Sequence, residues 1–183
     1  MVSRVIPVQA FDLVIFGGTG DLARRKILPS LFRRFAAGQM PDDAFVIGVA
    51  RSDLNTKSYQ KLVITALREF EPELSDSAEL SNFTKQIKYV QIDAQGDFGW
   101  LDLAGKVRKD AVQAFYFSVS PSLFGQLAEK LHEYSIASQS SRIVLEKPFG
   151  KDLSSAQTLN AVLKEHFSED QIYRIDHYLG KET

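Results

Sequence analysis

The first group of residues able to do chemistry is a glycine-rich turn. Gly17-Gly-Thr-Gly-Asp-Leu-Ala23 follows a short apolar run and precedes an amphipathic stretch. In this G-x-x-G-x-x-A spacing, Gly17 permits a tight turn, Gly20 lets a phosphate approach the backbone, and Ala23 lets a helix lie close to a sheet. The N–H groups at the start of such a helix bind anions. We therefore predict a phosphate site formed by Gly17, Gly18, Thr19, Gly20, Asp21 and Leu22, with a ligand-free turn as the alternative.

A second candidate group follows the next apolar run, in Val49-Ala-Arg-Ser52. In nucleotide-binding sheets this position contacts the adenosine ribose, where an acidic residue favours NAD and an arginine favours the 2′-phosphate of NADP. The Arg51 guanidinium can donate two hydrogen bonds to a phosphate, and Ser52 adds a hydroxyl. We therefore predict NADP as the cofactor. The nearby Asp53 leaves NAD open, and a solvated arginine is the alternative for Arg51.

The ends of the later apolar runs carry further candidates. Asp93 and Ala94 are placed beside the adenosine half of a cofactor by position alone, and a plain loop is the alternative. Glu146-Lys-Pro-Phe-Gly150 is more specific. The Lys147 ammonium would lie over the reacting end of a dinucleotide, where it can stabilise developing negative charge. An ordinary X-Pro turn is the alternative, and the cis or trans state of the Lys147–Pro148 bond is open.

The last group lies in Arg174-Ile-Asp-His-Tyr-Leu-Gly-Lys-Glu182. His177, Tyr178 and Lys181 supply hydrogen-bond donors suited to a phosphate monoester. Asp176 is poorly suited to hold a phosphate but well suited to orient a histidine base. Each of these residues alone is typical of a surface, whereas together they favour a substrate site.

These groups follow apolar runs that we interpret as strands, at residues 11–16, 44–50, 86–92, 112–119, 142–146 and 172–175. Helices are expected at residues 22–37, 57–70, 121–131 and 153–166, with a kink or break at Pro29. The alternation predicts an α/β fold: a doubly wound, mostly parallel six-stranded Rossmann-type sheet with helices on both faces. We expect one domain over residues 1–183, with ligands beyond the carboxyl ends of the strands.

The composition excludes several classes of protein. Of the 183 residues, 44% are hydrophobic and 25% are charged, which is typical of a globular domain and not of a disordered chain or a coiled coil. A net charge of -1 argues against nucleic-acid or membrane partners. The lack of cysteine excludes a disulfide scaffold and thiolate metal ligands, and no metal site is expected. Polar residues interrupt the longest uncharged stretch, 111–128, so we expect a soluble, cytoplasmic protein.

Taken together, the motifs GGTGDLA at 17–23, EKPFG at 146–150 and RIDHYLGKE at 174–182 resemble the glucose-6-phosphate dehydrogenase family. The resemblance covers residues 11–183 and is to the N-terminal coenzyme-binding domain of that family. It implies oxidation of D-glucose 6-phosphate at C1 to 6-phosphogluconolactone, with hydride transfer to NADP, at the entry to the pentose phosphate pathway. A non-catalytic NADP-binding module that senses redox state, or another sugar dehydrogenase with a Glu-Lys-Pro turn, is the alternative.

The resemblance also implies roles for single residues. Arg51 would meet the adenosine 2′-phosphate, Lys147 would contact both the nicotinamide and the sugar, and Asp176 would orient the general base. The substrate would be held by Lys26, Lys147, His177, Tyr178 and Lys181. The base itself is a histidine further downstream, in a second α+β domain that carries dimer contacts. We therefore expect a C-terminally truncated chain that is inactive alone, and a homo-oligomer for the full-length enzyme.

Overall fold

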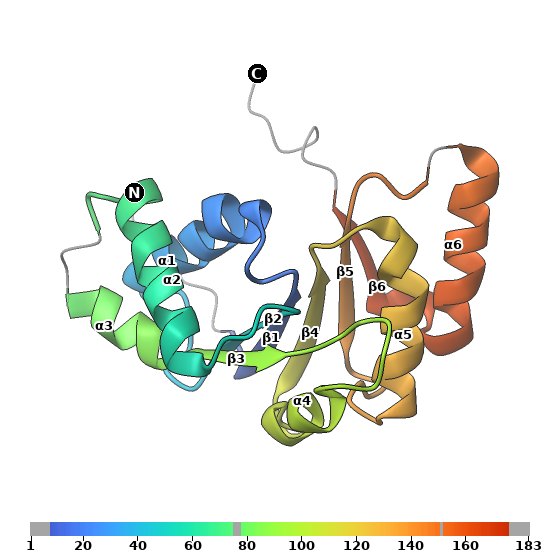
Figure 1. The fold of residues 1–183 in the computed structure, drawn as a ribbon, viewed down its shortest axis with the longest axis horizontal. Helices are drawn as coiled ribbons and strands as arrows, with labels where there is room; N and C mark the ends of the chain where they lie inside the picture. The colour runs from blue at the N-terminus through green and yellow to red at the C-terminus, as the bar shows by residue number, and fades with distance from the viewer. Residues whose placement is uncertain (1–7, 75–77, 151, 176–183) are drawn as a thin grey trace.

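A computed structural model of the chain describes residues 8–74, 78–150 and 152–175. Its centre is one sheet of six parallel strands in the order β3-β2-β1-β4-β5-β6 (Figure 1). The strands are β1 (Phe11–Phe16), β2 (Phe45–Ala50), β3 (Ile87–Gln91), β4 (Val112–Phe117), β5 (Arg142–Glu146) and β6 (Ile172–Ile175). The strand order reverses between β1 and β4, so the loops after these strands diverge and leave a crevice. The predicted doubly wound fold is confirmed.

Helices cover both faces of the sheet, as predicted (Figure 1). One face carries the π-helix η1 (Ala23–Ile27), α1 (Leu28–Ala36), α2 (Thr56–Phe70) and α3 (Ala78–Lys85). The other carries α4 (Trp100–Lys106), the 3-10 turn η2 (Pro121–Leu123), α5 (Phe124–Glu133) and α6 (Leu153–His166). A short 3-10 turn, η3 (Glu169–Gln171), leads into β6. No helix of the described residues is long and apolar enough to cross a bilayer.

A kink or a break was predicted at Pro29, but the helical stretch is continuous there and only changes from π-helix to α-helix, with Ile27 and Leu28 both in the right-handed helical region. The segment before Pro29 is the π-helix η1, and α1 then begins at Leu28 with Pro29 in its first turn. The helices α3 and α4 were not among the expected elements. α4 begins after Gly99, whose φ of 88° and close approach to the Gln91 carbonyl exclude a side chain.

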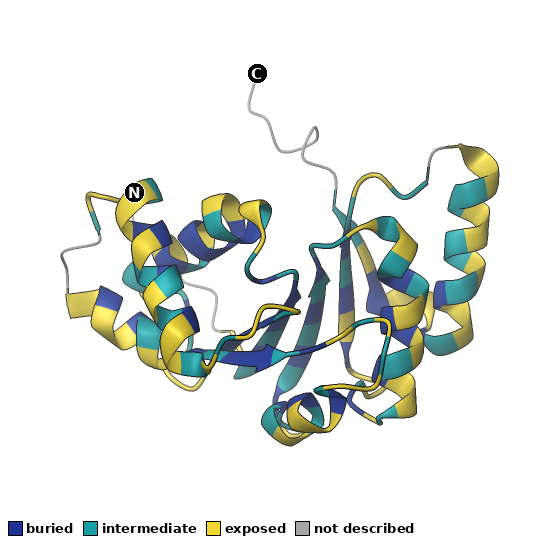
Figure 2. Cartoon of the chain, in the orientation of Figure 1, coloured by how far each residue is buried: buried dark blue, intermediate teal, exposed yellow. Residues whose placement is uncertain are grey.

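The central strands are buried or partly buried on both faces, as Figure 2 shows by their dark blue and teal colours. Two apolar clusters result, one on each face of the sheet. The first is centred on Phe16, Phe117 and Trp100, with the Phe16 and Phe117 rings 5.4 Å apart and edge to face. The second is centred on Phe32, Tyr59 and Phe83 under α1, α2 and α3. Because both faces are covered, the polar groups able to meet a ligand lie at the ends of the strands.

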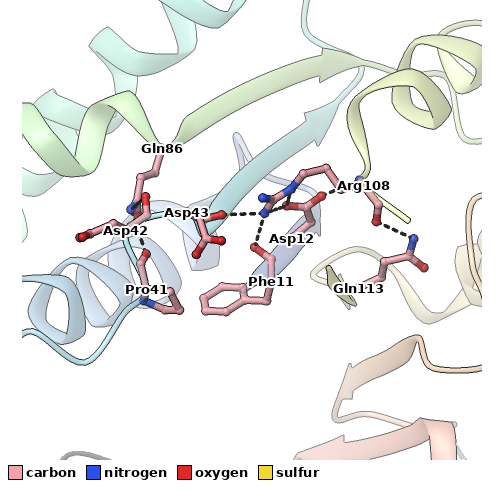
Figure 3. Close-up of polar contacts among 8 residues, drawn as sticks. All are labelled: Phe11, Asp12, Pro41, Asp42, Asp43, Gln86, Arg108 and Gln113. Carbon is pink, nitrogen blue, oxygen red and sulfur yellow. Dashed lines mark hydrogen bonds and ion pairs between the residues drawn. The ribbon is translucent and has the colours of Figure 1, made fainter. Parts of the chain in front are cut away.

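One charged side chain is fully buried at the amino end of the sheet. The carboxylate of Asp12 on β1 accepts hydrogen bonds from the Arg108 backbone N–H at 2.7 Å and from the Arg108 guanidinium at 3.0 and 2.6 Å. The same guanidinium donates to the carbonyls of Phe11 and Asp43 (Figure 3). These contacts join β1 to the segments before β2 and β4. The buried charge is therefore paired and fully hydrogen-bonded, as burial requires.

Candidate functional site

The glycine turn after β1 is shaped by backbone contacts that only glycine allows. Gly17 has a φ of 84°, and a Cβ there would lie 2.1 Å from the Ser118 carbonyl oxygen. The N–H groups of Gly17 and Gly18 donate to the Val49 carbonyl at 2.8 and 3.0 Å, and that of Gly20 donates to the Gly17 carbonyl at 2.8 Å. Gly17 and Gly18 therefore fix the turn against β2 and β4. The N–H groups that remain for an anion are those at the start of the helical stretch from Asp21 onward.

A tyrosine that sequence reasoning missed supports this turn from beneath. Tyr59 on α2 is fully buried, and its hydroxyl donates to the Gly18 carbonyl at 2.9 Å. Its ring occupies the space where a side chain on Gly48 would lie, with a Cβ there only 2.2 Å from the Tyr59 Cζ. Burial raises the pKa of the Tyr59 phenol, so the hydroxyl stays a donor. Glycine at position 48, within an otherwise apolar strand, is the sequence signal that a neighbouring group comes close.

The turn opens onto a cleft of about 590 Å³ at the carboxyl ends of β1, β2, β3 and β4. Its lining brings together residues that the sequence nominated separately: Gly17, Thr19, Gly20, Arg51, Ser52, Asp93 and Ala94. Gly18 and Asp21 are not among the residues lining this cleft, and Leu22 lines a smaller one beside it. A cleft that combines helix-start N–H groups, a guanidinium and an apolar floor suits an elongated anionic nucleotide.

The backbone that carries Arg51 and Ser52 is held by β3. The Tyr89 hydroxyl donates to the Ala50 and Ser52 carbonyls at 3.1 and 2.7 Å, and the Gln91 side-chain amide donates to the Arg51 carbonyl at 3.2 Å. Burial raises the pKa of Tyr89 to about 12. The Arg51 and Ser52 side chains are exposed at the cleft, and the Ser52 hydroxyl is 3.4 Å from that of Thr19. The glycine turn, which follows β1, and Arg51, which follows β2, thus face the same cleft.

The loop after β3 closes the same cleft. Trp100 donates its indole N–H to the carbonyls of Asp93 and Gly96, each at 3.1 Å, while the Asp93 side chain accepts from the Gln95 N–H at 3.0 Å. Because the Trp100 ring is fully buried, it anchors the loop to the core. Asp93 and Ala94 therefore line the same cleft as Arg51, and their place beside the adenosine half of a cofactor stays a prediction.

β5 ends at Glu146, and the Lys147–Pro148 bond in the turn that follows is cis. This turn borders a second cleft of about 180 Å³, together with Leu22, Phe117 and Pro121. Val119 lines both clefts, so they adjoin. The Lys147 side chain is exposed at this smaller cleft. A dinucleotide with its adenosine half near Arg51 would extend past Val119 toward Lys147.

The predicted substrate residues are placed only in part. Asp176, His177, Tyr178 and Lys181 lie outside the described residues. Lys26 is exposed on η1, after the glycine turn, and it lines neither cleft. His132 and His166 lie in the last turns of α5 and α6 with ring centroids 5.5 Å apart, away from the carboxyl ends of the strands. Within the described ranges, no group of three or more His, Cys, Asp or Glu could hold a metal ion.

Comparison with known proteins identifies the family. The family described as "Glucose-6-phosphate dehydrogenase, NAD binding domain" matches residues 14–183. A glucose-6-phosphate 1-dehydrogenase of Rhizobium meliloti is 44% identical over all of this chain, which spans 38% of that protein. One from Gluconobacter oxydans is 41% identical over 96% of this chain, which spans 37% of it. The chain thus corresponds to somewhat more than a third of these relatives.

Solved structures agree with this comparison. A glucose-6-phosphate dehydrogenase in complex with its substrate glucose-6-phosphate superposes with a TM-score of 0.83 at 33% identity, covering 97% of this chain and 39% of that one. A glucose-6-phosphate 1-dehydrogenase from Mycobacterium avium gives a TM-score of 0.86, also at 33% identity, over 95% of this chain and 37% of that one. The sheet order and overall fold are thus those of an NAD(P)-binding domain, and the chain belongs to the glucose-6-phosphate dehydrogenase family.

Proposed function

We propose that this chain is the coenzyme-binding part of an enzyme that oxidises D-glucose 6-phosphate at C1 to 6-phosphogluconolactone, with NADP as the hydride acceptor. The observation that carries the proposal is the shared cleft: the glycine turn and the Arg51 guanidinium face one space, and Lys147 borders the space beside it. A cation at the end of β2 favours the 2′-phosphate that distinguishes NADP from NAD.

Each part of the cleft would have a separate task in binding. The helix-start N–H groups after Gly20 would receive the pyrophosphate, and Arg51 with Ser52 would receive the 2′-phosphate. Lys147 would donate to the sugar at the reacting end and stabilise negative charge that develops on its oxygen. Bound NADP supplies a nicotinamide ring that accepts a hydride. The rigid carboxyl ends of the strands would increase the reaction rate by holding the cofactor and the sugar in a fixed relative orientation.

A titration of the purified chain with NADPH and NADH tests the choice of cofactor. Wild-type chain should bind NADPH more tightly, and Arg51→Ala should lower NADPH affinity about thirtyfold, since a charge-assisted hydrogen bond contributes about 2 kcal/mol. NADH affinity should not change. Arg142→Ala is the matched control, because Arg142 is an exposed arginine at the amino end of β5, away from the cleft. Equal affinities for both cofactors, unchanged by Arg51→Ala, would refute the assignment.

Catalysis by this chain alone is expected to be absent. By likeness to the family, we assign the proton-abstracting base to a histidine that is not in this chain. His132 and His166 lie at the ends of α5 and α6 and do not line either cleft. Purified chain mixed with glucose 6-phosphate and NADP should therefore form no NADPH above the buffer rate. Steady-state turnover by the purified chain would show that the chemistry is complete without such a base.

The oligomeric state and the cellular compartment belong to the same proposal. By its likeness to the family, we expect the enzyme that contains this domain to be a cytoplasmic homo-oligomer. Light scattering on that enzyme measures the first expectation directly, and a monomer at micromolar concentration would contradict it.

A further inference from the structure

A tyrosine on the neighbouring strand contacts the turn that carries Lys147. Tyr116 lies on β4 in register with Val144 of β5. Because side chains alternate along a strand, Glu146 projects from the same face as Val144, one step closer to the carboxyl end. The Tyr116 hydroxyl spans this step and donates a hydrogen bond to the Glu146 carboxylate. This hydrogen bond thus joins β4 to Glu146, the last residue of β5, which directly precedes Lys147.

The phenol is suited to be a permanent donor in this contact. Tyr116 is partly buried against the cluster under α1 and α2. Burial raises the pKa of Tyr116, and the adjoining Glu146 carboxylate raises it further, because a phenolate beside a carboxylate would be repelled. The hydroxyl is therefore protonated at neutral pH and remains a hydrogen-bond donor. A hydrogen bond from a neutral donor to a carboxylate is stronger than one between two neutral groups.

We propose that Tyr116 is a positioning residue for the reacting end of the site: through Glu146, it fixes the Lys147 turn at the mouth of the smaller cleft. This inference rests on the proposed function. Lys147 is exposed at the smaller cleft, and ordering the backbone that carries it on a ligand would cost conformational entropy. Anchoring the residue before it lowers that cost, because the backbone at Lys147 is already in place when the nicotinamide half arrives.

The test compares two ligands that reach different distances along the site. NADPH extends from Arg51 to Lys147, whereas 2′,5′-ADP carries only the adenosine half and ends before Val119. Tyr116→Phe should weaken NADPH binding by the chain about fivefold, which corresponds to about 1 kcal/mol for one lost hydrogen bond. Binding of 2′,5′-ADP should stay within twofold. A general loss of folding would weaken both ligands equally, so this difference is specific to positioning.

Two further variants change the acceptor of the same hydrogen bond, Glu146. Glu146→Ala removes the acceptor and should repeat the selective loss of NADPH affinity. Glu146→Gln keeps an acceptor oxygen and should retain most of the affinity. Tyr173→Phe is the matched control, since Tyr173 is an exposed tyrosine on the next strand, β6. Circular dichroism melts of each variant identify any variant that is unfolded. The affinities of the folded variants then decide whether Tyr116 has the positioning role.

The possible results separate the inference from the proposed function. If wild-type chain binds neither NADPH nor 2′,5′-ADP, the proposed cofactor site is wrong and the role of Tyr116 is refuted with it. If wild-type chain binds both ligands, but Tyr116→Phe and Glu146→Ala leave NADPH affinity unchanged or weaken both ligands equally, the cofactor site stands and the positioning role is wrong.

Discussion

The Tyr59 hydroxyl donates a 2.9 Å hydrogen bond to the carbonyl oxygen of Gly18. This bond joins the buried side of α2 to the glycine turn. The bond is buried, so its loss leaves an unpaired carbonyl beneath the turn. Tyr59→Phe should lower the free energy of unfolding by about 1 kcal/mol. It should also weaken NADPH and 2′,5′-ADP equally, since both ligands need the turn. Urea denaturation and ligand titration measure these effects, and an unchanged ligand affinity would show that the turn keeps its shape without Tyr59.

The requirement for glycine at position 17 can be separated into backbone conformation and steric clash. Gly17 and Gly38 have positive φ values of 84° and 67°, but a Cβ on Gly38 would meet nothing within 4 Å, whereas one on Gly17 would lie 2.1 Å from the Ser118 carbonyl. Gly38→Ala should therefore cost only the left-handed conformation, about 1 kcal/mol. Gly17→Ala should cost clearly more and abolish nucleotide binding. Similar unfolding free energies for the two variants would mean that β4 can move away from the turn.

The buried Asp12–Arg108 pair predicts a large effect on stability without an effect on binding. The Arg108 side chain is 28% exposed, so solvent reaches the guanidinium that the loss of Asp12 leaves unpaired. The cost is therefore below that of a fully buried pair, at about 2 kcal/mol for the lost charge-assisted hydrogen bonds. Asp12→Ala should destabilise the chain by about that amount. The cleft proposed to bind NADPH lies at the opposite, carboxyl ends of the strands. NADPH affinity should therefore be unchanged under conditions in which the variant is folded.

The control for this experiment is an exposed pair in the same chain. Asp102 and Lys106 form an i,i+4 ion pair on α4, with the Asp102 side chain 59% exposed. Solvent and salt screen such a pair, so Asp102→Ala should leave the denaturation midpoint unchanged. A loss for Asp12→Ala no larger than that for Asp102→Ala would contradict the role of the buried pair.

Tyr89 predicts how stability depends on alkaline pH. In the unfolded chain its phenol loses a proton near pH 10, whereas in the folded chain its pKa is about 12. Between these values the unfolded state binds fewer protons than the folded state, so the free energy of unfolding falls as pH rises. The window is therefore pH 10 to about 12. Tyr89→Phe should reduce the slope of stability against pH within this window, and the same slope in both proteins would show that Tyr89 does not contribute to it.

The sequence predicted the fold because its strands are nearly continuous apolar runs that end in turn residues. All six strands lie within two residues of their expected bounds, since strands buried on both faces leave a strong pattern. The helices α3 and α4 were missed because they are short and bury only two residues each, Leu80 and Phe83 in α3, and Trp100 and Leu103 in α4. Short helices with so few core residues show no clear period.

The sequence allowed prediction of the site residues that would contact a ligand directly, but not of the residues that support them. Gly17, Arg51 and Lys147 have residue types that match phosphate or charge, and the structure places each at the carboxyl end of its strand. Tyr59, Tyr89 and Tyr116 act through other residues, and their partners are backbone carbonyls or a carboxylate far away in the sequence. No local pattern reports such a contact, because a buried tyrosine in a helix or strand has the same spacing whether or not its hydroxyl supports a site.

A crystal structure of the chain with NADPH tests the central claim most directly. The claim predicts the pyrophosphate at the turn that begins with Gly17, the 2′-phosphate within hydrogen-bond distance of the Arg51 guanidinium, and the nicotinamide beside Lys147. NADPH bound elsewhere, or in this cleft with its 2′-phosphate turned away from Arg51 toward solvent, would contradict it.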